Sequence, residues 1–154
     1  IEAFRRCGDP LWIVGSGPEE RRLRALAPPS VRFFGWQPSE RLPELYRGAR
    51  ALLFPGVEDF GIAPVECQAM GRPVVALKSG GLCETVRSVG NGADPTGVLY
   101  SSASVDGLLE GLSVFRGCEA DFEPSRLRHH AGAFRRDRFV DELRSFAAPG
   151  IRTC

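Results

Sequence analysis

Short apolar runs alternate with segments of helical periodicity along the chain. Five runs read as buried strands, because each is short, rich in apolar residues and followed by residues typical of turns. The expected strands lie at residues 11–14, 31–34, 51–54, 73–77 and 97–100. Helices are expected at about 18–26, 38–47, 63–70, 83–86, 104–116 and 125–147.

This alternation of strands and helices favours a parallel sheet with helices on both faces, an α/β Rossmann-like fold. In such sheets, ligands bind outside the carboxyl ends of the strands. The glycine-rich turns of this chain follow strands, so we expect them to gather at that edge. The 154 residues suit a single domain.

Composition argues against two classes of protein. The formal net charge is +1, so the broad basic field of a nucleic-acid-binding protein is absent from the sequence. No apolar run approaches the roughly 20 residues that a membrane-spanning helix requires. The first residues contain no apolar stretch typical of a signal peptide, lack an initiator Met and begin inside an amphipathic pattern. We therefore expect a fragment of a cytoplasmic protein, with contact at the inner face of the membrane left open.

Cysteine usage agrees with a reducing compartment. The chain has five cysteines and no Cys-x-x-Cys pair, so free thiols are expected rather than a disulfide or zinc framework.

A glycine turn follows the first expected strand. Gly15 and Gly17 lead into a helix, and free backbone N–H groups at such a turn suit an anion or a closely approaching ligand. An ordinary tight turn explains the two glycines equally well. Glu20 stands where a dinucleotide fingerprint needs its third glycine, which disfavours an NAD-dependent dehydrogenase.

The stronger signal is a pair of carboxylates around a Phe-Gly turn. Glu58 lies on the loop, and Glu66 follows seven residues later in the first turns of the next helix. Both carboxylates can accept hydrogen bonds from vicinal hydroxyls of a ribose or hexose. Between them, N–H groups around Gly61 and Ile62 lie at a helix N-terminus, where diphosphate charge is favoured. An acidic start to an ordinary helix remains the alternative.

Three further polar positions have simpler interpretations. Lys78, beside the Gly80-Gly81 turn, could reach a phosphate, but a solvated surface lysine is favoured. His129 and His130 lie among arginines, and a solvated helix face is favoured over metal binding or acid–base catalysis.

Taken together and in this order, these motifs resemble the retaining glycosyltransferases of family four, which have two Rossmann-like domains in a GT-B fold. The resemblance covers nearly all of the chain, and the loop and helix that carry the two acids resemble those of bacterial mannosyltransferases of polysaccharide assembly. The segments that carry the resemblance are residues 11–18, 31–35, 49–51, 58–75 and 80–86.

The resemblance implies roles for individual residues. Glu58 matches the first acid of the family's Glu-x7-Glu pair, which contacts the donor sugar and is the catalytic candidate, and Glu66 matches the second, which binds the ribose hydroxyls. The other implied donor-binding residues line the cleft (Gly15, Gly17), lie where the base is held (Trp36, Gln37) or lend backbone N–H groups (Phe60, Gly61, Ile62).

The resemblance also implies what the chain lacks. The matched segment is the C-terminal, nucleotide-sugar-binding domain, so residues 1–154 form one donor-binding domain without the acceptor domain, the first central strand, or the Arg and Lys that meet leaving-group charge. Contact with a membrane would come only through the missing domain. The chain contains no Asp-x-Asp pair for a divalent cation, so we expect no metal and no cofactor.

The missing central strand has a structural consequence. In the strand order 3-2-1-4-5-6, its removal leaves a gap between the strands at 11–14 and 51–54. Either these strands close up, or their apolar edges stay open and favour association.

Three functions therefore remain open. The favoured function is transfer of a sugar, with retention, from a nucleotide-diphosphate donor, GDP-mannose first. The main alternative is a non-catalytic nucleotide-sugar-binding or interaction module of the same fold. A sugar-nucleotide epimerase is a more distant alternative.

Overall fold

The computed structural model describes residues 1–92 and 94–147. Every expected strand forms, with each boundary within one residue of its expected position. The strands are β1 (Leu11–Val14), β2 (Val31–Gly35), β3 (Leu52–Phe54), β4 (Val74–Leu77) and β5 (Gly97–Tyr100). The helices are α1 (Glu2–Cys7), α2 (Glu20–Leu26), α3 (Leu42–Gly48), α4 (Ile62–Ala69), α5 (Leu82–Thr85), α6 (Val105–Cys118), α7 (Pro124–Ala131) and α8 (Arg136–Ala147), with short 3-10 turns η1 (Glu119–Asp121) and η2 (Gly132–Phe134).

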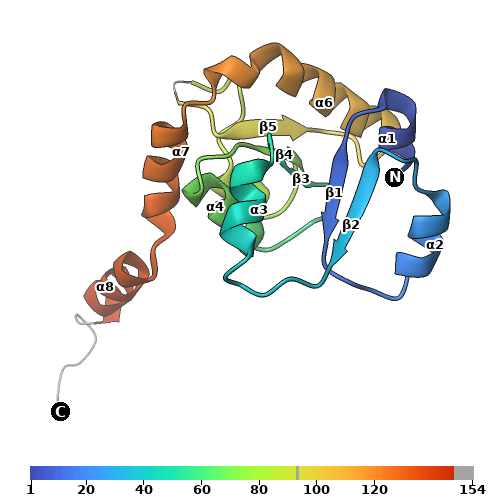
Figure 1. The fold of residues 1–154 in the computed structure, drawn as a ribbon. Helices are drawn as coiled ribbons and strands as arrows, with labels where there is room; N and C mark the ends of the chain where they lie inside the picture. Colours follow the sequence, from blue (N-terminus) through green and yellow to red (C-terminus); the bar gives the residue numbers. More distant parts are fainter. Residues whose placement is uncertain (93, 148–154) are drawn as a thin grey trace.

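The strands form two parallel sheets rather than one (Figure 1). One sheet has the order β1-β2 and the other β3-β4-β5, and β1 does not pair with β3. The break falls between the two strands where the sequence predicts a gap. Of the two expected outcomes, the structure has the open one, in which the strands on either side have not closed up.

Helices cover both faces of the three-stranded sheet, as predicted. Because successive side chains of a strand point to opposite faces, Val75 and Leu77 pack with Phe115 of α6, whereas Val74 and Ala76 pack with Cys67 of α4. The α/β architecture with parallel strands and two helical layers is therefore confirmed.

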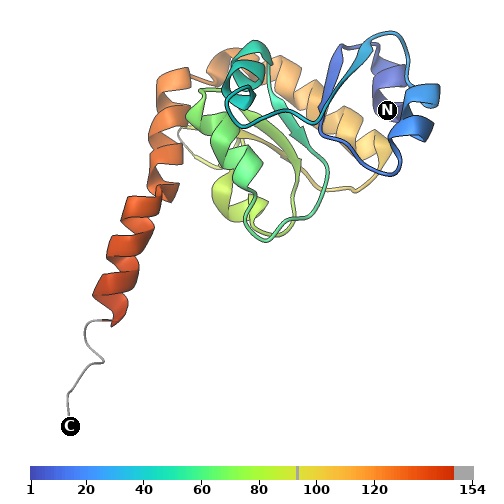
Figure 2. The ribbon, with the colours of Figure 1, turned by 60° about the horizontal axis from the view of Figure 1, so that its bottom comes forward.

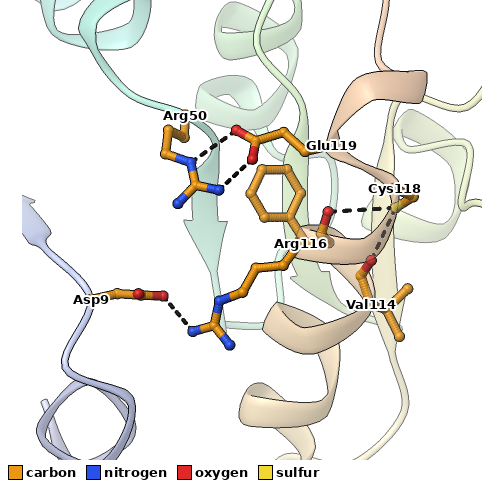
Figure 3. Close-up of polar contacts among 7 residues, drawn as sticks. Asp9, Arg50, Val114, Arg116, Cys118 and Glu119 are labelled. Atoms are coloured by element: carbon orange, nitrogen blue, oxygen red, sulfur yellow. Dashed lines mark hydrogen bonds and ion pairs between the residues drawn. The ribbon is translucent and has the colours of Figure 1, made fainter.

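Helix α6 connects the two sheets. It packs against β5 and β4 at one side and against α1 at the other (Figure 1). Figure 3 shows two ion pairs near its C-terminal end, where Arg116 binds Asp9 ahead of β1 and Glu119 binds Arg50 ahead of β3. The Arg50 guanidinium, through its hydrogen bond to Glu119, holds the pKa of that carboxyl below its usual range. The starts of β1 and β3 are thus tied to the end of α6 and to η1 directly after it, although the strands do not pair.

Two expected helix starts were wrong. Helix α3 begins at Leu42 rather than Pro38, because residues 38–41 form a turn in which the Arg41 N–H donates to the Pro38 carbonyl at 2.9 Å. Helix α2 begins at Glu20 rather than Pro18, after a turn closed by the Glu20 N–H and the Gly17 carbonyl at 3.1 Å.

The single helix expected at 125–147 is also wrong, because it is divided into α7, η2 and α8. Arg135 has φ −69° and ψ 146°, an extended conformation that ends the helical path. Phe134 turns inward, and its ring lies edge-on to His130 at 5.3 Å. Beyond this bend, α8 projects from the body of the molecule (Figure 2) and exposes Phe139, Leu143 and Phe146.

Two further expectations concern cysteines and membranes. The described cysteines (Cys7, Cys67, Cys83 and Cys118) are free thiols, as predicted, and Cys154 lies outside the described residues. Among residues 1–92 and 94–147, no helix has the length and apolar character needed to cross a membrane.

Candidate functional site

The loop that carries Glu58 is held against the Gly80-Gly81 turn. The Gly81 N–H donates to the Glu58 carbonyl at 2.8 Å. A Cβ on Gly80 would lie 2.3 Å from the Glu58 carbonyl oxygen, and one on Gly81 would lie 2.1 Å from the Asp59 carbonyl oxygen. Only glycine permits so close a backbone approach, so the two glycines fix the path of residues 58–60 at the end of β3.

Helix α4 begins directly after this loop and leaves its N-terminus available. Gly61 is its N-cap residue, with φ 83°, a left-handed conformation that favours glycine. No side chain among the described residues caps this end of the helix. The first N–H groups of a helix have no partner within it and carry the positive end of the helix dipole. This end of α4 is therefore suited to a phosphate group.

Glu66 lies one turn into α4 and is exposed. Its carboxylate is oriented toward α3 by a hydrogen bond. The Tyr46 hydroxyl, from α3, donates a hydrogen bond to Glu66 Oε2 at 3.2 Å. Burial, together with the charge of Glu66, raises the pKa of Tyr46 well above its usual range, so the phenol remains a donor.

A set of buried polar contacts supports the loop from beneath. The Thr85 hydroxyl donates to the Gly81 carbonyl at 3.1 Å, and the Thr85 carbonyl accepts from Gln68 Nε2 at 3.0 Å. The same carbonyl lies 3.0 Å from His130 Nε2. Thr85, Gln68 and His130 thus join α5, α4 and α7 behind the candidate site.

His130 corrects a prediction from the sequence. Its side chain was expected on a solvated face, but it is only 6% exposed, whereas its neighbour His129 is exposed as expected. The reason is that α7 packs against α4, which turns one side of α7 toward the protein interior. Burial lowers the pKa of His130 from its usual 6.5, against the opposing effect of the hydrogen bond to Thr85.

This burial predicts a pH dependence of stability. The folded state favours neutral His130, so as the pH falls the unfolded chain binds a proton at this side chain before the folded chain does. The contribution of neutral His130 to the free energy of unfolding is therefore fully present above the ordinary pKa of 6.5 and is lost as the pH drops below it. The melting temperature of the parent chain should fall between about pH 7.5 and about pH 5.5, and His130→Gln should show a smaller fall. His129→Gln is the matched control and should keep the parent's fall, because His129 is exposed. Equal falls in both variants would contradict the prediction.

The first glycine turn lies with Trp36 and Gln37. The Gly15 N–H donates to the Gly35 carbonyl at 2.7 Å, and the space beside Gly15 and Gly17 is open. Trp36 is 73% exposed. The Gln37 amide nitrogen donates to the carbonyls of Phe34 and Trp36, at 2.8 and 3.0 Å.

The structure therefore divides the candidate residues into two groups, one at the end of each sheet. Gly15, Gly17, Trp36 and Gln37 follow β1 and β2, whereas Glu58, Phe60, Gly61, Ile62 and Glu66 follow β3. Among the described residues, no hydrogen bond joins the first group to the second.

Two residues of the second group expose apolar side chains, and a buried thiol lies next to Glu66 in the sequence. Phe60 is 45% exposed and Ile62 is 68% exposed. The Phe60 ring lies edge-on to Phe134 at 5.8 Å, so the loop also contacts the bend before α8. Burial raises the pKa of the Cys67 thiol to about 12, which excludes Cys67 as a nucleophile near neutral pH.

Sequence reasoning missed Tyr46, Gln68 and Thr85. Tyr46 and Glu66 are 20 residues apart, and only the packing of α3 on α4 brings them together.

Within the part of the chain that the structure describes, no three His, Cys, Asp or Glu side chains are close enough to hold a metal ion. A hollow of about 280 Å³ lies between α7 and the side chains of Arg87 and Asp94.

Parallel strands, glycine turns at their carboxyl ends and an uncapped helix N-terminus define a Rossmann-like α/β protein. The family described as "Glycosyl transferases group 1" matches residues 1–114. The chain therefore belongs to this glycosyltransferase family, and its fold matches solved structures of GT-B glycosyltransferases.

Individual proteins agree with this assignment. A D-inositol 3-phosphate glycosyltransferase of Salinispora arenicola is 37% identical over 115 residues, covering 74% of this chain and 25% of that protein. An O-antigen chain mannosyltransferase B of Escherichia coli is 38% identical over 76 residues, covering 49% of this chain and 20% of that protein. The structure of HepE from Anabaena with UDP and glucose superposes with a TM-score of 0.73 at 19% identity, covering 97% of this chain and 43% of that one. The chain thus spans a quarter or less of these two curated relatives.

Proposed function

We propose that this chain binds the nucleotide-diphosphate sugar of a retaining, metal-independent glycosyltransferase. The observation that carries the proposal is the loop at residues 58–61. Glu58 precedes the uncapped N-terminus of α4 in the sequence, and Glu66 follows it one turn into the helix. The contact with Gly81 fixes the path of the loop. Family membership supports sugar transfer as the reaction of the whole protein.

Each part of the donor has a matching group in this arrangement. The first N–H groups of α4 stabilise the diphosphate, whose charge grows as the bond to the sugar breaks. The Glu58 carboxylate accepts hydrogen bonds from the sugar hydroxyls and is the catalytic candidate. The Glu66 carboxylate accepts hydrogen bonds from the ribose hydroxyls. Trp36 and Gln37 contact the base, which requires the nucleotide to span from the end of β3 to the end of β2.

The donor proposed first is GDP-mannose. The loop and helix that carry the two acids resemble those of bacterial mannosyltransferases, and one relative is named a mannosyltransferase. UDP-glucose is the competing donor, because the structurally similar HepE was solved with UDP and glucose. Both donors fit the same carboxylates and helix N-terminus.

The acceptor lies outside the proposed role of this chain. Because the chain covers 43% of HepE, we assign acceptor binding, and any contact with a membrane, to a segment beyond residues 1–154. Cytoplasmic location is proposed with it, since nucleotide sugars are donors in that compartment.

Titration calorimetry with GDP-mannose, UDP-glucose and NAD tests this proposal. We expect GDP-mannose to bind most tightly and NAD least, because the glycine turn after β1 has Glu20 where a dinucleotide site needs glycine. Affinity for GDP-mannose should be unchanged by EDTA, as a metal-independent site requires. Tighter binding of UDP-glucose would change the donor and keep the class of function, whereas tighter binding of NAD would overturn the proposal.

The competing function is a module that binds nucleotide sugars without catalysis. It predicts the same calorimetry, so transfer must be measured with the whole protein that contains this chain. Loss of transfer in a Glu58→Gln form of that protein favours the enzyme, and absence of transfer in the parent favours the module.

A further inference from the structure

Tyr46 makes the one hydrogen bond to the Glu66 carboxylate among the described residues. Its hydroxyl donates to Oε2 at 3.2 Å. No Arg or Lys side chain within the described residues forms an ion pair with Glu66, which leaves Oε1 without a protein partner there. Within this part of the chain, the one hydrogen bond that orients the carboxylate therefore comes from a hydroxyl group.

The Tyr46 ring is half-buried and held by packing. It packs against the buried cluster of Cys67, Val74, Ala76, Leu82 and Val86, which lies between α4, β4 and α5. A rigid ring presents its hydroxyl at a fixed position, whereas the exposed Glu66 side chain has three rotatable bonds. The Tyr46 hydroxyl also keeps its own proton and stays a donor, because burial and the charge of Glu66 raise the pKa of Tyr46.

We propose that Tyr46 is a positioning residue of the donor site, whose hydroxyl holds the Glu66 carboxylate in the rotamer that accepts the ribose hydroxyls. This inference rests on the proposed function, because it takes Glu66 as the ribose acceptor. Ordering Glu66 before the ligand arrives removes part of the rotamer entropy that binding would otherwise cost. With Oε2 engaged by Tyr46, Oε1 faces the diol, so the site discriminates nucleotides by their ribose hydroxyls.

The test compares two probes in Tyr46→Phe by calorimetry: the better-bound of UDP and GDP, and its 2′,3′-dideoxy analogue. Tyr46→Phe should weaken binding of the ribonucleotide by about fivefold, the net effect of one ordinary hydrogen bond. Binding of the dideoxy analogue should not change, because that ligand has no hydroxyl for Glu66 to accept. In a Glu66→Gln background, Tyr46→Phe should have little further effect, since the two residues act as one unit.

Tyr100→Phe is the matched control. It removes the hydroxyl of the chain's other tyrosine, which is buried on β5 away from Glu66, and should leave both affinities unchanged. Equal weakening of both probes in Tyr46→Phe, or no weakening of either, overturns the inference alone. If the parent chain binds neither UDP nor GDP, the proposed function fails and the inference fails with it.

Discussion

Replacing Gly81 by alanine should lower the free energy of unfolding by about 2–3 kcal/mol, the usual effect of an added methyl group that forces a backbone shift. The new Cβ would lie 2.1 Å from the Asp59 carbonyl oxygen, 2.6 Å from the Asp59 carbonyl carbon and 2.8 Å from the Phe60 Cα. All three atoms belong to the backbone, so no side-chain rotation relieves the contact. Gly81 has φ −64°, which alanine also adopts, so the effect comes from the clash rather than from backbone strain.

The displaced loop carries Glu58, so the same variant should lose affinity for the nucleotide sugar. Ordinary van der Waals contact begins near 3.4 Å, so the loop and the turn must separate by more than an ångström. Glu58 would then no longer meet the sugar hydroxyls, so affinity should fall by about tenfold or more, the effect of losing a hydrogen bond to a charged group. Thermal unfolding and calorimetry with the bound nucleotide sugar measure the two effects.

Gly117→Ala is the matched control for this substitution. Gly117 lies in α6, and a Cβ there would meet nothing within 4 Å. Alanine is the better helix former, so this variant should gain about 0.5–1 kcal/mol of stability and keep its affinity. A Gly81→Ala protein as stable and as tight-binding as Gly117→Ala would show that the loop does not depend on this contact.

The strands could be predicted from the sequence because each is a continuous apolar run ended by a turn. The parallel arrangement followed from their alternation with helices, and the break between β1 and β3 followed from the strand order of the related fold. Helix boundaries were less predictable. Pro38 is an acceptable first residue of a helix, yet the chain uses it in a turn that closes on Arg41.

The candidate site was predictable only where neighbours in sequence are also neighbours in space. Glu58 and Gly61 lie on the loop before α4 and Glu66 lies within that helix, so the element that carries each residue follows from local structure. The contact of Tyr46 with Glu66 depends on how two helices pack, and the burial of His130 depends on which side of α7 meets α4. Hydrophobic periodicity predicts neither the Tyr46 contact nor the burial of His130, because tyrosine and histidine occur both inside proteins and on their surfaces.

The two acids of the site should be separable by ligand. Glu66→Gln should weaken binding of the nucleoside diphosphate and of the nucleotide sugar alike, by about tenfold or more, because a hydrogen bond to a charged group contributes about 1.5–3 kcal/mol. Glu58→Gln should weaken the nucleotide sugar by a similar factor and leave the nucleoside diphosphate unchanged, since Glu58 is assigned to the sugar. The measurement is calorimetry of each variant with GDP-mannose and GDP, or with UDP-glucose and UDP if these bind better.

Glu84→Gln is the control, because Glu84 is an exposed acid on α5. Its substitution changes the net charge by the same amount as Glu58→Gln or Glu66→Gln. Neither affinity should change in that variant. The assignment of the sugar to Glu58 requires the difference between its two ligands, so equal weakening of GDP and GDP-mannose in Glu58→Gln would contradict it. Glu58 and Glu66 are both exposed, one in the loop before the N-terminus of α4 and one within the helix. If Glu58→Gln instead weakened both ligands and Glu66→Gln weakened only the nucleotide sugar, the nucleotide would lie in the opposite direction, with the ribose at Glu58 and the sugar at Glu66.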